Sequence, residues 1–452
     1  MSADVDTIAA IATAPGGGAI GIVRVSGPGA AAIAKAITRR TLQPRHAHFA
    51  QFHDYGSNEI IDAGLVLLLP GPGSYSGEDM VEFQAHGSGP VLEALLAASL
   101  AAGARQARPG EFTERAFLNG RLDLAQAEAV ADLIAAGSRQ SARAALASLR
   151  GVFSDRVAAV NTELIAQRTL LEACLDFPDE DTGALEELAA RLAQLHGELA
   201  GLRAAAGQGR VLNDGLDVAI IGAPNVGKST LLNRLAGFDR AIVSELPGTT
   251  RDTVEQPITL DGIELRLIDT AGLRDSGNVI EQEGIRRSHA ALERAALVLV
   301  VDESGAAREG NGAIATRDPE AIGVDPAQII YVHNKIDLDA AAPGRVKRSG
   351  SQHVRVSALT GAGMDGLHDA MREAAGLAPG ETEFSARRRH LDGLDRAMRS
   401  ISAALNTLAG GGDHELVAED LRQAHQALGE LTGRFTSEDL LGEIFAGFCI
   451  GK

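Results

Sequence analysis

The sequence predicts a multidomain fold: an α+β N-terminal domain, an all-α helical domain, and an α/β domain inserted into the helical one. Short β-like runs with Gly and Pro turns come first, helical patterns follow, and strands then alternate with helices before helical sequence resumes. Helical sequence on both sides of an α/β segment indicates an insertion, which is tolerated where chain ends lie close together. The expected boundaries are 1–119, 120–214, 215–378 and 379–452.

Composition supports several cores. A chain of 452 residues is too long for one core, and 45% hydrophobic residues are ample for burial. Trp is absent and aromatic residues make up 3%, so Ala, Leu, Val and Ile must fill the cores. We therefore expect Ala-rich helix packing.

The net charge limits the choice of partners. A formal charge of −18 argues against a broad grip on nucleic acid or anionic membrane, because phosphate contacts need clustered Lys and Arg. Any RNA contact must be local or shared with a partner. The basic cluster that could touch phosphate is Arg387-Arg388-Arg389-His390, for which a solvated helix start is the alternative interpretation.

Cysteine and hydropathy patterns indicate the cytosol. Cys174 and Cys449 have no paired spacing, so neither a disulfide framework nor a zinc site is expected. No stretch has the apolar length of a membrane span, and the start at Met1 lacks the features of a signal peptide. We expect a cytoplasmic protein without stable membrane association.

Periodicity predicts the elements before the insertion. Ala19–Val25 and Gly64–Leu69 are typical of buried strands, and Pro90–Ala102 is typical of a helix rich in Ala and Leu. From Leu122 to about Arg210, apolar residues recur at helical spacing. This pattern indicates a helix bundle.

The inserted segment shows five apolar runs separated by helical patterns, which predict a doubly wound domain with a largely parallel sheet. Helical sequence resumes after the Pro379-Gly380 turn, is broken at Gly410-Gly411-Gly412, and then restarts. The expected strands are Asp217–Ile221, Glu264–Asp269, Leu297–Val301, Ile329–Asn334 and His353–Ser357.

A glycine-bounded loop follows the strand at Asp217–Ile221 and opens a helix. Residues 222–229 read Gly-Ala-Pro-Asn-Val-Gly-Lys-Ser, the pattern of a P-loop whose backbone amides cradle phosphate. Lys228 adds positive charge and the Ser229 hydroxyl can bind Mg²⁺. A tight strand-to-helix turn without a ligand is the alternative interpretation.

Further nucleotide motifs follow in the expected order. Asp269-Thr270-Ala271-Gly272 can meet Mg²⁺ and the γ-phosphate, and Asn334-Lys335-Ile336-Asp337 supplies a carboxylate suited to the N1–H and 2-amino donors of guanine. Ser357-Ala358-Leu359 would complete the base site, and a Thr hydroxyl within 247–252 can reach Mg²⁺. Together they predict a guanine-nucleotide domain.

The catalytic groups for hydrolysis are less evident. Hydrolysis needs an oriented water and compensation for the charge that develops on the transferred phosphoryl group. Ras-like proteins place a Gln directly after the Asp-x-x-Gly motif to orient the water. Leu273 stands there, so another group must act, and the acidic stretch 280–284 offers candidates. Arg251 and Arg274 lie close in sequence to these motifs and could offset the developing charge. An arginine at either position is more typically a solvated surface charge.

These motifs resemble those of the MnmE family of tRNA modification GTPases, also called TrmE. The resemblance extends beyond the nucleotide motifs and covers nearly the whole chain. Its segments are 222–229, 248–252, 269–274, 108–119, 122–129 and the ending Phe448-Cys449-Ile450-Gly451-Lys452.

The resemblance implies a potassium ion beside the phosphates in place of an arginine finger when two G domains meet. It assigns the ion's ligands to Asn225, Ser244, Leu246 and Thr249, Mg²⁺ to Ser229 and Thr250, and the orientation of water to Glu281. The residues expected to bind GTP are Asn225, Val226, Gly227, Lys228, Ser229, Thr230, Ser244, Glu245, Leu246, Pro247, Gly248, Thr249, Thr250, Asp269, Thr270, Ala271, Gly272, Asn334, Lys335, Ile336, Asp337, Ser357, Ala358 and Leu359.

The resemblance also implies an N-terminal domain that forms a homodimer and binds 5-formyl-tetrahydrofolate or a related one-carbon folate. It places Arg24, Glu82, Arg121 and Lys452 near the folate. Arg121 stands where the family pattern often has Lys, and Arg is not a neutral exchange for Lys. Cys449 could be a nucleophile or a free thiol packed on a helix.

The implied process is addition of an aminomethyl or carboxymethylaminomethyl group to C5 of the wobble uridine of certain tRNAs. The protein would act with an FAD- and NADH-using partner of the MnmG type, in a heterotetramer. Two alternatives remain open. One is a GTP-driven assembly switch, for instance in ribosome maturation, without one-carbon chemistry; the other is a self-sufficient folate enzyme regulated by GTP.

Overall fold

The computed structural model divides the chain into two compact units, which are described separately. Unit 1 comprises Met1–Ala131, Phe153–Ile165 and Arg422–Lys452, and unit 2 comprises Asp132–Val152 and Ala166–Leu421. The structure describes residues 6–57, 59–176, 184–238, 255–260, 263–269, 295–304, 325–339, 341–348, 351–376, 382–435 and 437–451. In that part of the chain, no helix is long and apolar enough to cross a membrane.

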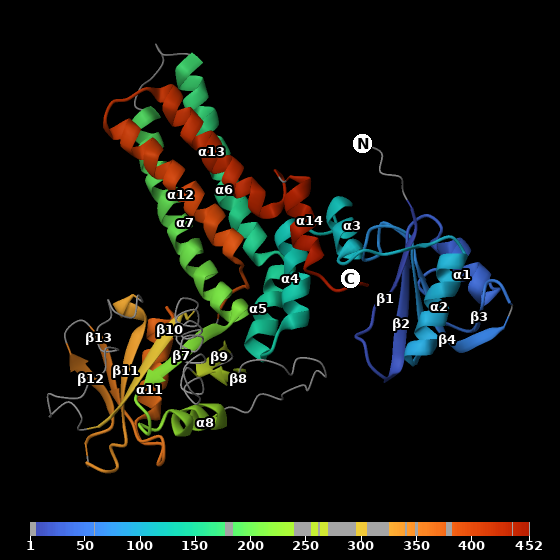
Figure 1. The fold of residues 1–452 in the computed structure, drawn as a ribbon. Helices are drawn as coiled ribbons and strands as arrows, with labels where there is room; N and C mark the ends of the chain where they lie inside the picture. The colour runs from blue at the N-terminus through green and yellow to red at the C-terminus, as the bar shows by residue number, and fades with distance from the viewer. Residues whose placement is uncertain are drawn as a thin grey trace, which may run out of the picture. The chain divides into compact units, whose positions relative to one another are not determined.

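Unit 1 is built around a six-stranded sheet with the order β3-β4-β5-β2-β1-β6 (Figure 1). Neighbouring strands are antiparallel, except that β1 and β6 are parallel. The predicted strands at Ala19–Val25 and Gly64–Leu69 belong to β2 and β4. The strands are β1 (Ile8–Ile11), β2 (Gly18–Ser26), β3 (His48–His53), β4 (Ile60–Leu69), β5 (Met80–Gly87) and β6 (Arg105–Gln106).

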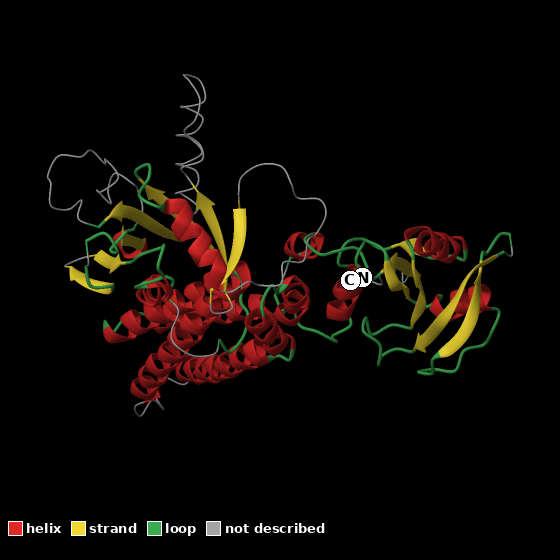
Figure 2. Ribbon diagram, turned by 90° about the horizontal axis from the view of Figure 1, so that it is seen from below, coloured by secondary structure: helices red, strands yellow, loops and turns green. Residues whose placement is uncertain are grey.

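Two helices, α1 (Ala30–Thr38) and α2 (Gly89–Ala101), cover one face of this sheet (Figure 2). Alternate strand residues point toward them, as the period of two in a strand requires. Phe52 and Phe83 meet edge to face at 5.5 Å between ring centroids in this core. The predicted α+β character of the N-terminal domain is confirmed.

The opposite ends of the sequence meet inside unit 1. Phe117 of α3 (Glu111–Leu118) packs against Phe445 of α14 (Glu438–Ala446), with Phe448 beside them. Gly433 has φ +86°, and a side chain there would approach the Phe117 ring to 2.6 Å. The C-terminal residues are therefore part of the N-terminal unit.

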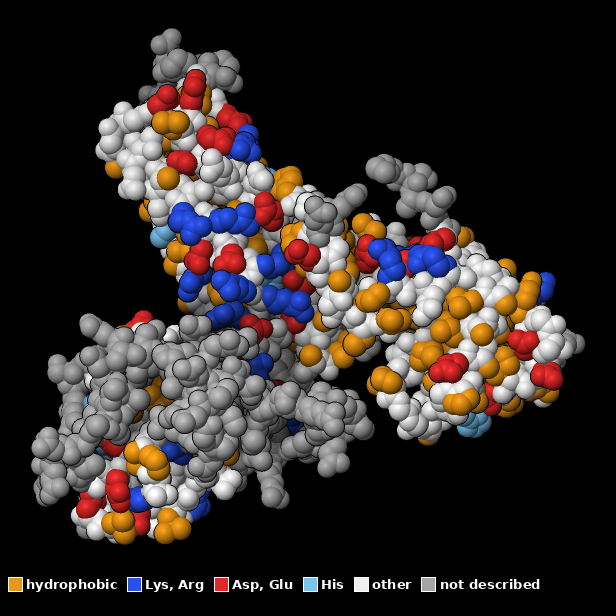
Figure 3. Space-filling view, in the orientation of Figure 1, with side chains coloured by type: hydrophobic (Ala, Val, Ile, Leu, Met, Phe, Trp, Pro, Cys, Tyr) orange, Lys and Arg blue, Asp and Glu red, His pale blue; other side chains and the backbone are white. Residues whose placement is uncertain are grey.

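The helical part of unit 2 is organised by α7 (Ala184–Asp214) and α12 (Arg388–Ala409), which lie side by side (Figure 1). Buried residues recur along both at helical spacing, as expected for packed amphipathic helices. Lys and Arg side chains gather on this part of the surface (Figure 3). The remaining long helices are α4 (Leu124–Ala135), α5 (Arg139–Leu149), α6 (Val152–Asp176) and α13 (His414–Thr432), of which α4, α6 and α13 contain residues of both units.

The α/β part of unit 2 contains a seven-stranded sheet with the order β12-β13-β11-β10-β7-β9-β8. The five inner strands are parallel, and the edge strands β8 and β12 are antiparallel to their neighbours. The strands are β7 (Leu216–Gly222), β8 (Glu255–Leu260), β9 (Ile263–Asp269), β10 (Leu297–Glu303), β11 (Ile329–Asn334), β12 (Gly344–Arg348) and β13 (Ser351–Arg355), with a 3₁₀ turn, η4 (Pro326–Gln328), before β11.

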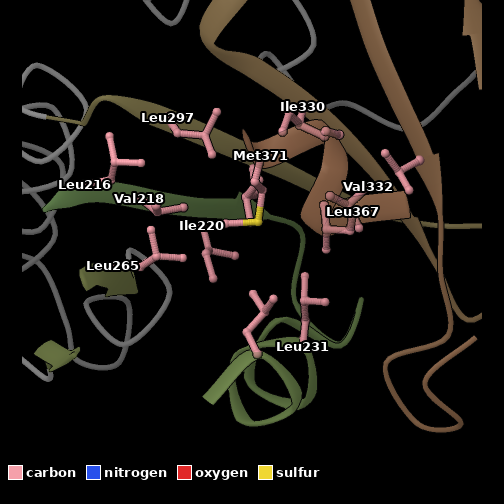
Figure 4. Close-up of a cluster of buried hydrophobic side chains, with 14 of the residues drawn as sticks. Leu216, Val218, Ile220, Leu231, Leu265, Leu297, Ile330, Val332, Leu367 and Met371 are labelled. Atoms are coloured by element: carbon pink, nitrogen blue, oxygen red, sulfur yellow. The ribbon is translucent and has the colours of Figure 1, made fainter. Parts of the chain in front are cut away.

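Two helices, α8 (Lys228–Phe238) and α11 (Met364–Ala374), supply the core of this sheet. Leu231, Leu367 and Met371 point from them toward the buried strand residues Val218 and Ile330 (Figure 4). The apolar runs at residues 218–221 and 297–301 are the expected consequence of parallel strands buried on both faces. The predicted insertion of a largely parallel α/β fold between helical segments is confirmed.

The strand expected at His353–Ser357 ends earlier, at Arg355. Val356 still donates its amide to the His333 carbonyl at 2.9 Å, but the Ser357 amide turns to the Ala362 carbonyl, also at 2.9 Å. The pattern of apolar residues continues past the strand because Val356 and Ala358 are buried under α11. Burial without ladder pairing is indistinguishable from a strand by periodicity alone.

A buried carboxylate ties α3 to the edge of the sheet in unit 1. Glu111 accepts hydrogen bonds from Arg105 at 2.6 Å, from the Arg108 amide at 2.7 Å and from Arg115 at 3.2 Å. Its side chain is only 3% exposed. Burial alone would raise the pKa of Glu111, but the hydrogen bonds and charge of Arg105, with the Arg108 amide and Arg115, outweigh burial and lower it.

Glu111→Gln should destabilise unit 1 by about 2 kcal/mol at pH 7, because it removes the buried counter-charge that Arg105, Arg108 and Arg115 share. The measurement is hydrogen-exchange protection of the β1 and β2 amides in the full chain. Glu114→Gln is the matched control, since Glu114 makes a single ion pair with Arg108.

The same pair of proteins gives a pH test. The folded pKa of Glu111 is lowered, so its contribution is complete above the unfolded value of about 4.3 and disappears as pH falls below it. The difference between wild type and variant should therefore shrink below about pH 4. A difference that stays constant through that range would contradict a role for the charge.

Candidate functional site

The loop between β7 and α8 has the backbone of a phosphate-binding turn. A Cβ at Gly222 would lie 2.2 Å from the Val301 carbonyl oxygen, and one at Gly227, where φ is +93°, would lie 2.3 Å from Nδ2 of Asn334. Asn225 takes a left-handed conformation with φ +64°. Both glycines are thus required by close approach, and the loop leads directly into the N-terminus of α8.

Lys228 closes over this loop. Its Nζ donates to the carbonyl oxygens of Gly222 at 2.9 Å and Ala223 at 2.7 Å, and the residue is buried. Ser229 and Thr230 follow in the first turn of α8 and are exposed. A buried ammonium, a helix N-terminus and an exposed hydroxyl together suit a phosphate with its magnesium ion.

Asn334, at the end of β11, joins the phosphate loop to the loop after β13. Its Nδ2 donates to the Val226 carbonyl at 2.8 Å, and its Oδ1 accepts from the Ala358 amide at 2.9 Å. Asn334 is 2% exposed, so both ends of its amide are used inside the protein. The side chain fixes the distance between the two loops.

The rest of the base-binding motif lies around this asparagine. Lys335 has φ +64° and its ammonium lies 3.3 Å from Glu303, while Ile336 is buried. Asp337 accepts a 2.5 Å hydrogen bond from the Ser357 hydroxyl. The Asp337 carboxylate can therefore accept hydrogen bonds from a purine edge while Ser357 holds it in place.

Sequence reasoning missed Arg234 of α8. Its Nε donates to the Ala358 carbonyl at 2.9 Å, and Nη2 donates to the Leu359 carbonyl. Leu231 and Leu235, on either side of it in the sequence, face the core, which turns Arg234 toward Ala358 and Leu359 in the loop after β13, here called the base loop. An arginine at helical spacing is usually a surface charge, so the sequence offered no signal for this contact.

Several expected residues lie outside the described part of the chain. Backbone pairing of Ile220 with Asp269 places the end of β9 at the same edge of the sheet as the phosphate loop. The expected residues outside the described ranges are Ser244, Glu245, Leu246, Pro247, Gly248, Thr249, Thr250, Thr270, Ala271, Gly272, Glu281 and Lys452, together with Arg251, Leu273 and Arg274.

A second cluster forms in unit 1 around Arg24. Arg24 and Glu82 are cross-strand partners on β2 and β5, with 2.9 Å between their charged atoms and side chains 20% and 18% exposed. The guanidinium also lies over the rings of Tyr75 and Phe112, at 5.6 and 5.7 Å. Burial raises the pKa of Tyr75, against the effects of Thr113 and Arg24.

The C-terminal residues reach this cluster. Arg24 Nη1 donates to the Gly451 carbonyl at 3.4 Å, and Ile450 pairs with Pro109. A side chain at Gly451 would lie 2.2 Å from the Ile11 carbonyl oxygen. Cys449 is exposed, and its carbonyl accepts from the Gly110 amide at 3.3 Å.

Arg121 is exposed and lies beside the loop that contains Gly77, where a Cβ would be 3.2 Å from its Cγ. The structure therefore joins Arg24, Glu82 and the residue before Lys452, and it places Arg121 on a neighbouring loop.

The α/β fold, the phosphate loop and the base-binding motif from Asn334 to Asp337 define a P-loop guanine-nucleotide-binding domain within a larger chain. The family model for the MnmE helical domain matches residues 124–449 of this chain. The family model for the N-terminus of the GTP-binding protein TrmE matches residues 7–121.

The chain is 49% identical over 452 residues to a tRNA modification GTPase MnmE from Nitrosococcus oceani, covering 99% of this chain and 97% of the relative. It is 50% identical over 460 residues to the protein of the same name from Xanthomonas campestris pv. campestris, covering 100% of each. The chain belongs to the MnmE family of tRNA modification GTPases.

Arg234→Ala should lower the affinity for GTP about tenfold, because the base loop loses both hydrogen bonds that Arg234 donates to it. Arg234→Lys should fall between wild type and Ala, since an ammonium cannot reproduce the two-donor fork. Titration with a fluorescent guanine nucleotide measures the affinity.

Arg345→Ala is the control for that measurement, because the Arg345 side chain pairs with Glu373 of α11. If Arg234→Ala binds as tightly as wild type, Arg234 does not position the base loop.

Proposed function

We propose that the protein is a potassium-activated GTPase that adds an aminomethyl or carboxymethylaminomethyl group at C5 of the wobble uridine of certain tRNAs. It acts with an FAD-dependent partner of the MnmG type as a homodimer within a heterotetramer, in the cytoplasm and without stable membrane association. The observation that carries this proposal is the similarity to tRNA modification GTPases over the whole chain, together with the assembled base loop.

The chain's own residues fit guanine nucleotide and Mg²⁺. Lys228 and the amides at the start of α8 would hold the phosphates, and the exposed Ser229 hydroxyl would bind Mg²⁺ with Thr250. Asp337, held by Ser357, would accept from N1–H and the 2-amino group of guanine. Adenine lacks that pair of donors.

The potassium ligands proposed here are oxygen atoms of Asn225, Ser244, Leu246 and Thr249. Asn225 is the one within the described residues, and its left-handed backbone lies in the phosphate loop. Amide, hydroxyl and carbonyl oxygens are suitable ligands for a potassium ion. The ion would supply positive charge next to the phosphates, and Glu281 would orient the attacking water.

The cluster around Arg24 would receive the one-carbon folate. Glu82 can accept from pterin N–H donors, and Arg24 can donate to a carbonyl or carboxylate. The ring of Tyr75 lies against the guanidinium in the same cluster. Arg121 and Lys452 complete the proposed set.

GTP turnover should be faster in potassium than in sodium at equal ionic strength, because sodium is too small for ligands spaced for potassium. A release assay for phosphate from GTP measures the rates, with rubidium as a cation of similar size. Equal rates of GTP turnover in all three salts would contradict the cation-assisted mechanism. Glu281→Ala with full turnover would remove only the role of that residue.

Folate binding separates this function from a GTP-driven assembly switch, which needs no pterin site. The full chain should bind 5-formyl-tetrahydrofolate, and Glu82→Gln should weaken binding about tenfold by removing an acceptor for charged hydrogen bonds. Calorimetric titration measures both, with Asp62→Asn on the neighbouring strand as the control.

Absence of folate binding by the wild type would favour the assembly switch. Wobble-uridine modification that persists without the FAD partner would instead favour a self-sufficient folate enzyme regulated by GTP.

A further inference from the structure

Helix α12 carries an exposed row of arginines. Arg388, Arg396 and Arg399 are exposed and share one face, because steps of eight and eleven residues return to the same side of a helix. Asp392 lies on the same face, 3.9 Å from Arg388. The row is about 16 Å long, so it can meet several successive phosphates.

Helix α5 carries a second row. Arg139, Arg143 and Arg150 are exposed at steps of four and eleven residues, and no Asp or Glu occurs from residue 139 to residue 150. Arg150 is the C-cap residue of α5, so the row spans the length of the helix, and residues 139–150 carry a formal charge of +3.

The two rows belong to one surface. The Ser385 amide, just before α12, donates to the Ala144 carbonyl of α5 at 3.1 Å, and the Ser148 hydroxyl donates to the Ser385 carbonyl at 2.9 Å. Both serines are buried, so this junction is fixed. Basic side chains, with acidic side chains between them, gather over α5, α7 and α12 in Figure 3.

The local charge opposes that of the whole protein. Segments 139–150 and 387–399 contain eight arginines and two aspartates, in a chain with 60 acidic and 42 basic residues. Of the two aspartates, Asp395 pairs with Arg203 at 3.0 Å. A local excess of arginine attracts a polyanion such as a phosphate backbone even where the net charge of the protein is negative.

The chemistry of the surface favours nucleic acid. Guanidinium groups donate two parallel hydrogen bonds to phosphate, which makes arginine well suited to that partner. Within the described residues of the two segments, the exposed large apolar side chain is Leu146, at 37%. Protein interfaces usually have an apolar or aromatic core, which this surface lacks.

We propose that Arg139, Arg143, Arg150, Arg388, Arg396 and Arg399 form a surface that binds the phosphate backbone of tRNA. We call these six residues the arginine surface. The inference rests on the proposed function, which makes tRNA the substrate, and adds where this chain holds it. Backbone contacts position an RNA without reading its sequence, so base recognition belongs elsewhere.

The test measures how tightly an unmodified tRNA transcript binds to the full-length protein. Fluorescence anisotropy gives the affinity at salt concentrations from about 50 to about 200 mM. One variant carries Arg388→Gln, Arg396→Gln and Arg399→Gln. A second carries the same change at Arg139, Arg143 and Arg150. The charge-matched control carries it at the exposed residues Arg40, Arg191 and Arg434.

Each arginine-surface variant should weaken binding about tenfold and reduce the slope of log affinity against log salt by about 2. The control should stay within about twofold of wild type, because it loses the same charge elsewhere. Replacement of the α12 row by lysine should preserve the salt slope, which separates loss of charge from loss of folding.

Wild-type affinity and slope in both glutamine variants would overturn the inference. Loss of binding to the FAD-dependent partner with unchanged tRNA binding would also overturn it, and would assign the surface to an acidic protein. Failure of the wild type to bind tRNA at 50 mM salt would overturn it as well. GTP turnover and wobble modification by the wild type, measured in parallel, test the proposed function independently.

Discussion

The amide of Asn334 is the contact on which the nucleotide site depends. One buried side chain donates to the phosphate loop at Val226 and accepts from the base loop at Ala358. Gly227 has no side chain at the point where Asn334 passes, because a Cβ there would clash with Nδ2. Asn334 therefore fixes the spacing between phosphate and base recognition together with Arg234, and neither loop can move far without breaking a buried hydrogen bond.

Some of this architecture follows from the sequence and some does not. The inner strands β7 and β10 contain continuous apolar runs at residues 218–221 and 297–301, which periodicity detects. The edge strands β8 and β12 contain charged and polar residues typical of exposed edges, and they escaped detection for that reason. Arg234 escaped because its partners are backbone carbonyls of a distant loop, which no spacing rule encodes.

Contacts between residues far apart in the sequence are likewise only partly predictable from it. Arg24 and Glu82 were expected at one site only from a family resemblance, and the register of β2 against β5 supplies the physical reason that they meet. The boundaries at residues 119, 214 and 378 stay predictions. The two compact units cut across the helical segments instead, because residues 422–451 pack with the N-terminal unit through Phe117 and Phe445.

The distribution of charge connects these features. A net charge of −18 suppresses nonspecific attraction to polyanions, and the effect weakens over a Debye length of about 8 Å at physiological salt. A dense local row such as Arg388, Arg396 and Arg399 acts within that distance, so it can hold a phosphate backbone while the remaining surface repels it. An RNA could then bind in only a few orientations. Electrostatic exclusion over most of the protein would thereby contribute to specificity without any base contact.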